Sequence, residues 1–543
     1  MKKILAITLC VLMALTLFAG CTNGDVTREE NSVPTTEKDN NKTNGNTDTK
    51  DDPVDNRPAT KIRIWFMGGG ADNDDRLVVE AANARLRELG LNIEIDPIWT
   101  GGWAMGDEAQ IALNTGDNVD IYWTASWGLN YFNNARVGNF FRLDDPDNNL
   151  LNQYGREMKN IVSDVLWDAF VTDGPSGNGI YGIPGPKDYA AWFKMDVNNT
   201  RLAELGYDFD EIFTMDGSNH EIIFNPVFEE IMQASKDKYG PTFFPLNLEA
   251  GNFAQHFART DGDLTGLGVF MFPYDPMDPT QPKNPTVGLQ IEDEMFLRVL
   301  DKVRHFWEMG FIDPRLAIKD EAEDVIGSAH RVGEYMFSTG QYAYGHTAAM
   351  REERGIDVRY VPLSVVPIVS TMSAAGSGFG ISVYSKNPEA AMQFMNAWYT
   401  DNELAVILCE GVEGVHWNFD SEGLVELDRD ARESYATWRN GMGNVFILSP
   451  RTTDGHGFFE AFEAYNALGV GTTFVGFIFD NEPVSVEMAA LTSVINEYSS
   501  QLTVGAIDPK TAVPDYLAAL KANGIDRVLD ELNTQLREFY ASR

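Results

Sequence analysis

The sequence predicts an α/β fold, because strands and helices alternate from the point where its folded part begins. Residues 61–66 (KIRIWF) alternate in polarity as a half-buried strand does. Successive strands joined by helices predict a parallel sheet, and ligands bind beyond the carboxyl ends of the strands in such sheets. The further elements expected here are a helix from about Asp74 capped by Gly90, strand 91–99, helix 108–114 and strand 118–124.

Length and charge limit the class of partner. The chain has 543 residues, and its 42 basic and 81 acidic residues give a formal net charge of −39. A surface this acidic repels nucleic acid, and no Lys/Arg-rich stretch offsets it. At about 100 to 200 residues per domain, the length predicts two or three domains.

The first 21 residues have the pattern of a secretory signal. Lys2 and Lys3 precede an apolar run at 4–19, which is shorter than the roughly 20 residues that span a membrane. The stretch Phe18-Ala-Gly-Cys21 resembles the lipobox of bacterial lipoproteins, in which the cysteine is acylated, although leucine is usual at the position of Phe18. Cys21 is therefore predicted to carry lipid. The alternative is an ordinary signal peptide that happens to contain a cysteine.

Polar composition and cysteine number predict a tether and rule out a disulfide. Residues 22–60 have almost no apolar side chain, so they are expected to form a disordered tether. Cys10 leaves with the signal and Cys21 carries lipid, which leaves Cys409 as the one thiol of the folded part. Its apolar surroundings (LAVILC) predict a small buried residue and not a reactive thiol.

Later segments are more helical. Residues 292–308 carry apolar side chains on one stripe, ended by Gly310. Residues 484–502 and 525–539 repeat the same spacing of three and four. These helices are expected to pack against the body of the protein, although a partner-binding helix has the same pattern.

Several segments after Gly179 together resemble one known family. The motif at 379–398 (FGISVYSKNPEAAMQFMNAW) is similar to the strand, Ser-Lys-Asn-Pro-Glu and helix signature of family 1 extracellular solute-binding proteins of ABC importers. The turn at 411–417 (GVEGVHW) resembles that of the LplA-type lipoprotein branch, with Val415 in place of Lys and Trp417 in place of Tyr. The tail from about Ser449 resembles a domain of unknown function in that branch. Other matching segments are 179–184 (GIYGIP), Asp313-Pro314 and 337–341 (FSTGQ).

The resemblance implies a two-lobed periplasmic-binding-protein-like clamshell of type II, with crossing hinge segments and a helical C-terminal extension. It also implies a lipid-anchored receptor on the extracellular face of the membrane of a Gram-positive bacterium, one that captures a sugar or oligosaccharide for an ABC importer permease. Neither enzymatic activity nor a cofactor is expected. The implied domains are a signal peptide at 1–20, a tether at 21–60, a first lobe at 61–184 and 376–410, a second lobe at 185–375 and 411–448, and a C-terminal domain at 449–543 packed on the second lobe.

Tryptophans beside polar residues are the candidate ligand site. A sugar offers apolar C–H faces and edge hydroxyls, so its site needs flat aromatic rings beside carboxylates and amides. Two such clusters follow predicted strands, and two lie near the family-like segments. A single tryptophan is more often a core residue, but four clusters are harder to explain in that way. The predicted ligand-binding residues are Trp99, Trp103, Trp123, Ser126, Trp127, Asp188, Trp192, Glu413, His416 and Trp417.

Two other classes of protein stay open on the sequence alone. Carboxylates near aromatic residues also describe glycosidases, and a surface scaffold without a small ligand would share the anchor and tether. The sequence contains no Gly-x-Ser-x-Gly, His-Glu-x-x-His or phosphate-loop motif, and its seven histidines lack paired spacing. Residues 144–149 (DDPDNN) have the oxygen density of a calcium loop but lack its bidentate glutamate, so a solvated turn is expected.

Overall fold

The predicted signal peptide and most of the predicted tether lie outside the residues described by the structure, a computed structural model. Among the described residues, no helix combines the length and the apolar character needed to cross a bilayer. The described residues are 57–67, 74–100, 105–190, 193–216, 218–248, 260–261, 264–273, 284–318, 321–322, 325–326, 329, 333–341, 355–363, 366–428, 430–431 and 434–542.

Five strands form the first sheet, in the order β2-β1-β3-β15-β6. The predicted parallel arrangement is confirmed for β1, β2 and β3, with Phe66 opposite Trp99. The sheet as a whole is mixed, because β15 runs antiparallel to both β3 and β6. The strands are β1 (Thr60–Met67), β2 (Ile93–Thr100), β3 (Ile121–Thr124), β6 (Ile183–Pro184) and β15 (Gly378–Ile381).

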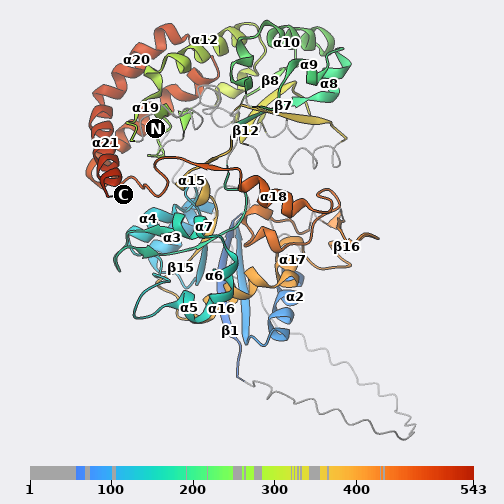
Figure 1. The fold of residues 1–543 in the computed structure, drawn as a ribbon, viewed down its shortest axis with the longest axis vertical. Helices are drawn as coiled ribbons and strands as arrows, with labels where there is room; N and C mark the ends of the chain where they lie inside the picture. Colours follow the sequence, from blue (N-terminus) through green and yellow to red (C-terminus); the bar gives the residue numbers. More distant parts are fainter. Residues whose placement is uncertain are drawn as a thin grey trace, which may run out of the picture. The chain divides into compact units, whose positions relative to one another are not determined.

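Helices cover this sheet (Figure 1), and the sequence predicted three of them, at Asp75–Glu88, Met105–Thr115 and Pro388–Thr400. Gly90 ends the first of them with φ +76°, a conformation that glycine adopts without strain. The long helices are α2 (Asp75–Glu88), α3 (Met105–Thr115), α16 (Pro388–Thr400) and α17 (Asn402–Glu410). The short ones are α4 (Tyr131–Arg136), α5 (Leu150–Tyr154), α6 (Arg156–Ile161), α7 (Asp164–Ala169), α15 (Thr371–Ala374) and α18 (Phe458–Asn466).

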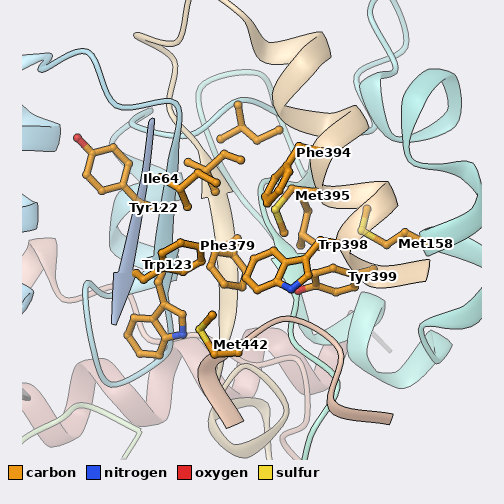
Figure 2. Close-up of a cluster of buried hydrophobic side chains, with 14 of the residues drawn as sticks. Ile64, Tyr122, Trp123, Met158, Phe379, Phe394, Met395, Trp398, Tyr399 and Met442 are labelled. Carbon is orange, nitrogen blue, oxygen red and sulfur yellow. The ribbon is translucent and has the colours of Figure 1, made fainter. Parts of the chain in front are cut away.

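Aromatic side chains fill the core of the first lobe (Figure 2). Trp398 of α16 is fully buried and lies with its ring centroid 5.1 Å from that of Phe379 and 5.5 Å from that of Phe66. Phe379 belongs to β15 and Phe66 to β1. The signature at 379–398 is thus a strand and a helix that pack on each other in one core.

A second sheet, in the order β13-β7-β12-β8, organises a separate hydrophobic core. Its strands are β7 (Phe193–Asn198), β8 (Leu246–Asn247), β12 (Phe337–Gln341) and β13 (Val358–Pro362). A small sheet contains β9 (Thr260–Asp261), β10 (Phe270–Pro273) and β11 (Gly288–Leu289). The helices are α8 (Asn199–Glu204), α9 (Phe209–Ile212), α10 (Pro226–Tyr239) and α12 (Glu294–Glu308).

The C-terminal helices share the second core, and the two predicted at 484–502 and 525–539 pack against the body of the protein as expected. The C-terminal helices are α19 (Ser485–Thr503), α20 (Pro509–Ala522) and α21 (Ile525–Ala541). Leu491, Leu520 and Leu532, one from each helix, join the same buried cluster as Val303 of α12. The helix α20 was not expected from the sequence, and Pro514 lies inside it.

Three segments cross between the two cores. The chain leaves the first sheet after β6 and enters the second at β7, returns between β13 and β15, and crosses again between α18 and Phe474. The last two crossings pair as parallel strands, β14 (Ile368–Val369) with β18 (Val470–Gly471).

The hydrophobic cores place residues 411–466 differently from the sequence expectation. Trp417, Val425 and Met442, expected in the second lobe, lie in the first core, as do Phe462 and Tyr465. We propose that the first lobe extends to about residue 466. This part of the chain also contains the hairpin of β16 (Trp417–Phe419) and β17 (Val425–Leu427), and the first lobe contains the pair β4 (Val171–Thr172) and β5 (Gly179–Ile180).

Trp398 is expected to be a main stabilising residue of the first lobe. Trp398→Ala should lower the free energy of unfolding by about 3 to 5 kcal/mol, the usual cost of emptying a buried aromatic site. Urea unfolding followed by circular dichroism measures this change. Leu468→Ala, at a side chain that is 60% exposed, is the control and should change it by less than about 0.5 kcal/mol. Equal effects of the two changes would contradict the assignment.

Candidate functional site

A cluster of three tryptophans lies at the carboxyl end of β3. The ring centroid of Trp127 is 5.2 Å from that of Trp123 and 5.9 Å from that of Trp438, and Trp123 and Trp438 are 6.0 Å apart. All three pairs meet edge to face, an arrangement that aromatic rings favour. Trp123 is fully buried, whereas Trp127 is 49% exposed. Trp123 is therefore the buried base of the cluster, and Trp127 is its solvent-exposed ring.

Hydrogen bonds fix the orientation of both predicted tryptophans. The indole N–H of Trp127 donates to the carbonyl oxygen of Gly376 at 2.9 Å, and that of Trp123 donates to Ser377 Oγ at 3.1 Å. Ser126 lies between them in sequence and is buried, with its hydroxyl donating to the carbonyl of Met372 at 2.8 Å. The exposed ring of Trp127 is thus held rigidly, which lowers the entropy cost of binding a flat ligand face.

The turn that carries Trp127 is strained. Leu129 has φ +40°, which is the one positive φ of a non-glycine residue among the described parts of the chain. Its carbonyl accepts the Thr124 hydroxyl, and the amide of Ala125 donates to the carbonyl of Gly128 at 2.8 Å. A Cβ on Gly128 would lie 3.0 Å from the Trp123 ring. Backbone strain of this kind persists where the surroundings determine it, and it is common at binding sites.

Asp188 forms an ion pair with Lys187, whose side chain lies beside Gly376 near the tryptophan cluster. Lys187 Nζ lies 2.9 Å from Asp188 Oδ1, and both side chains are mostly buried. A Cβ on Gly376, the residue that accepts the Trp127 indole, would lie 3.5 Å from Lys187 Nζ. Asn466 holds this crossing segment by donating to the carbonyl of Lys187 at 2.9 Å. A carboxylate and an ammonium group therefore lie close to the tryptophan cluster.

Trp99 and His416 belong to a second group, which is centred on Tyr435. Trp99 stacks on Phe66 with centroids 4.5 Å apart and meets Tyr435 at 5.9 Å. The ring of His416 lies 5.5 Å from that of Tyr435. His416 is fully buried, and its Nδ1 accepts the amide N–H of Val412 at 2.9 Å while its Nε2 is 3.5 Å from Asp74 Oδ2. These contacts place His416 beside Asp74, the residue that precedes α2.

Glu413 and Trp417 line a different cavity. Trp417 is buried and its indole N–H donates to the carbonyl of Gly411 at 3.0 Å, whereas Glu413 is exposed. Both line a space between α2 and α17 to which none of the three clustered tryptophans contributes. The structure therefore does not bring the predicted residues into one site. Trp103 and Trp192 lie outside the described residues.

Trp438 and Tyr435 connect the two aromatic groups and were not among the predicted residues. They lie three residues apart in a loop, and Trp438 is followed by Arg439-Asn440-Gly441. A Cβ on Gly441 would lie 2.5 Å from the Trp438 ring, so the small residue makes room for it. Trp438 has the pattern of a tryptophan beside polar residues that singled out the other clusters, so the signal was present.

Neither metal nor thiol chemistry is supported by the described residues. No group of three or more His, Cys, Asp or Glu side chains gathers in them as a metal site would require. Asp144, in the calcium-like stretch, instead accepts from Arg142 at 2.9 Å and from the amide of Ile180 at 3.0 Å. Cys409 is buried as expected, and burial raises the pKa of its thiol to about 12, which keeps it protonated and unreactive.

Comparison with known proteins agrees with this architecture. The chain is 24% identical over 509 residues to a carbohydrate ABC transporter substrate-binding protein of Streptococcus pneumoniae, covering 91% of this chain and 93% of that protein. The crystal structure of the N-glycan transport solute-binding protein NgtS from S. pneumoniae superposes with a TM-score of 0.72 at 20% identity, over 88% of this chain and 99% of that one. The NgtS complex with Man1GlcNAc gives a TM-score of 0.69 at 20% identity, with the same coverage.

The fold is that of the two-lobed type II solute-binding proteins, as the resemblance implied. Over most of its length the chain is similar to a substrate-binding protein of an ABC transporter, and it shares the fold of a solute-binding protein. Residues 473–541 match the domain of unknown function DUF3502. This match covers the three C-terminal helices that share the second core.

The different burial of Trp123 and Trp127 predicts different costs of truncation. Trp123→Ala should lower the free energy of unfolding by about 3 to 5 kcal/mol, because it empties a core position. Trp127→Ala should lower it by less than about 1 kcal/mol, because half of that ring already contacts solvent. Chemical denaturation of both variants measures the difference. A loss for Trp127→Ala as large as that for Trp123→Ala would show that Trp127 is a core residue.

Proposed function

We propose that this protein is a lipid-anchored extracellular receptor that captures a sugar or oligosaccharide and delivers it to the permease of an ABC importer. The observation that carries the proposal is the half-exposed ring of Trp127, fixed by its hydrogen bond to Gly376 at the carboxyl end of a parallel strand. Ligands of open α/β sheets bind at this edge. The relationship to a carbohydrate-binding protein of an ABC transporter supports the same ligand class.

The chemistry of the site suits a saccharide. An aromatic face covers the apolar C–H surface of a sugar ring, and charged or amide groups hold its hydroxyls through paired hydrogen bonds. Trp127 and Trp438 offer the aromatic surface, while Asp188 and Lys187 lie nearby as an acceptor and a donor. The other predicted residues of this edge, Trp99 and Ser126, position the loops around it.

Closure of two lobes on the ligand is part of the proposal. The first lobe supplies the tryptophan cluster, and Lys187 and Asp188 lie on a segment that crosses towards the second core. A ligand that contacts both the cluster and the crossing segment would favour one arrangement of the lobes by its differential affinity for it. The permease would then recognise the loaded receptor by that arrangement.

Titration against an oligosaccharide panel tests the ligand class. We expect saturable binding without product formation, measured by calorimetry and by chromatography of the recovered sugar. Trp127→Ala and Trp438→Ala should each weaken binding by about tenfold to a hundredfold, the usual loss of a stacking anchor of roughly 1 to 3 kcal/mol. Tyr384→Ala, at a side chain that is 45% exposed elsewhere on the first lobe, should leave affinity unchanged. Absence of binding to the whole panel would favour the scaffold class.

Cys21 is the proposed anchor. Cys21→Ala should move the protein from the membrane fraction to the medium, because a diacylated cysteine supplies the two chains that stable anchoring needs. Fractionation with immunoblotting measures the distribution, and Cys409→Ala, at the buried thiol, is the control that should stay with the membrane. Full retention of the Cys21 variant would mean that the lipobox assignment is wrong.

A further inference from the structure

A cavity of about 460 Å³ lies between α2, α17 and the chain from Val412 to Phe419. Its volume falls within the roughly 300 to 1,000 Å³ of small-molecule sites. Trp417 and Phe419 meet edge to face in its wall, 4.9 Å apart, and Phe419 is 48% exposed. Side chains from the two helices make most of the remaining wall apolar: Ala81, Ala84, Val406 and Ile407.

The charges around this cavity are unbalanced. Among the described residues that line it, Arg85 is the one basic residue, and three carboxylates share its guanidinium group. Asp401 holds it through two bonds of 3.0 and 2.8 Å, Glu88 lies at 3.0 Å and Glu403 at 2.9 Å. These acidic neighbours raise the pKa of Arg85, with Asp401 and Glu88 as the main causes. Glu413 adds a further carboxylate at the exposed rim.

The polar groups of the wall are largely occupied by the protein itself. The Asn402 amide donates to the carbonyl of Ile447, and the indole N–H of Trp417 donates to Gly411. Few donors are left to hold the hydroxyls of a sugar. An apolar wall with excess negative charge instead complements a ligand that has an apolar body and a positive head.

We propose that this cavity is a second binding site, which takes an organic ammonium ion with an aromatic or aliphatic body. The body lies against Phe419 and Trp417, and the ammonium group faces Glu413 and Glu403. The site goes beyond the proposed sugar-receptor function, and it lies apart from the tryptophan cluster because none of its lining residues belongs to that cluster.

Three probes of similar shape and different charge test the proposal: 2-phenylethylammonium, 2-phenylethanol and phenylacetate. Saturation-transfer NMR with the full chain should show the ammonium ion binding about threefold to fivefold more tightly than the alcohol at low salt, and no binding of the acid. Near 1 M salt, where the Debye length is about 3 Å, this preference should disappear. Equal binding of the ammonium ion and the alcohol at low salt, or no binding of the ammonium ion, would overturn the proposal.

Variants locate the site and separate it from the sugar site. Glu413→Gln should reduce the charge preference, and Phe419→Ala should weaken both the ammonium ion and the alcohol. Glu426→Gln is the matched control, since Glu426 is an exposed carboxylate on β17, the strand paired with that of Phe419, and does not line the cavity. Phe419→Ala should leave the affinity for oligosaccharide unchanged. The proposal of an ammonium site can therefore fail while the sugar proposal stands, and the sugar proposal can fail while the ammonium site stands. Unchanged ammonium binding in both Glu413→Gln and Phe419→Ala would refute this location.

Discussion

The close approach of three crossing segments at Gly469 is the constraint on which the two-core architecture depends. A Cβ at this position would lie 2.5 Å from Cγ2 of Val369, 3.0 Å from Cβ of Ala190 and 3.1 Å from the carbonyl oxygen of Asn466. Each of these neighbours belongs to a crossing or flanks one. A side chain at residue 469 would push the crossings apart. The hydrogen bonds between Asn466 and residues 187–190 would then be lost: Asn466 donates to the carbonyl of Lys187 and accepts from the amides of Tyr189 and Ala190.

The aromatic site depends on the same crossings. Ser377 and Gly376, which accept the indole N–H groups of Trp123 and Trp127, lie on the segment that returns from the second core. Lys187 lies on the outgoing segment and packs beside Gly376. Residues that are distant in sequence thus fix Trp123 of β3 and Trp127 of the turn that follows it. The rigidity of the binding surface therefore follows from how the crossings pack.

Local sequence patterns predicted several strands and helices, because their periodicity reflects burial. The strands at 61–66 and 118–124 and the helices at 292–308 and 525–539 each have one apolar face, and the structure confirms them as β1, β3, α12 and α21. The antiparallel β15 could not be placed in the first sheet from local pattern alone, since its partners β3 and β6 are distant in the chain. The helix α20 was not predicted, and it contains Pro514 although proline usually ends a helix.

The candidate site was less accessible to sequence reasoning. A tryptophan beside polar residues looks the same whether its ring is buried, as Trp123 and Trp417 are, or half exposed, as Trp127 is. Exposure is decided by what packs from elsewhere in the chain, and for Trp127 the neighbour is Trp438. The family-like turn at 411–417 was recognised, but its glutamate lines a cavity that the tryptophan cluster does not share.

The position of β15 has a consequence for how the chain folds. Trp123 and Ser377 are hydrogen-bonded across 254 residues, and the intervening chain contains the strands of the second sheet. The first sheet therefore cannot be completed until that intervening chain has been synthesised and has returned. Contacts of such high sequence separation carry a loop-closure cost before any packing offsets it, and they slow folding. During that interval the backbone N–H and C=O groups on the edge of β3 that later pairs with β15 are unpaired. A strand of another chain could then pair with them.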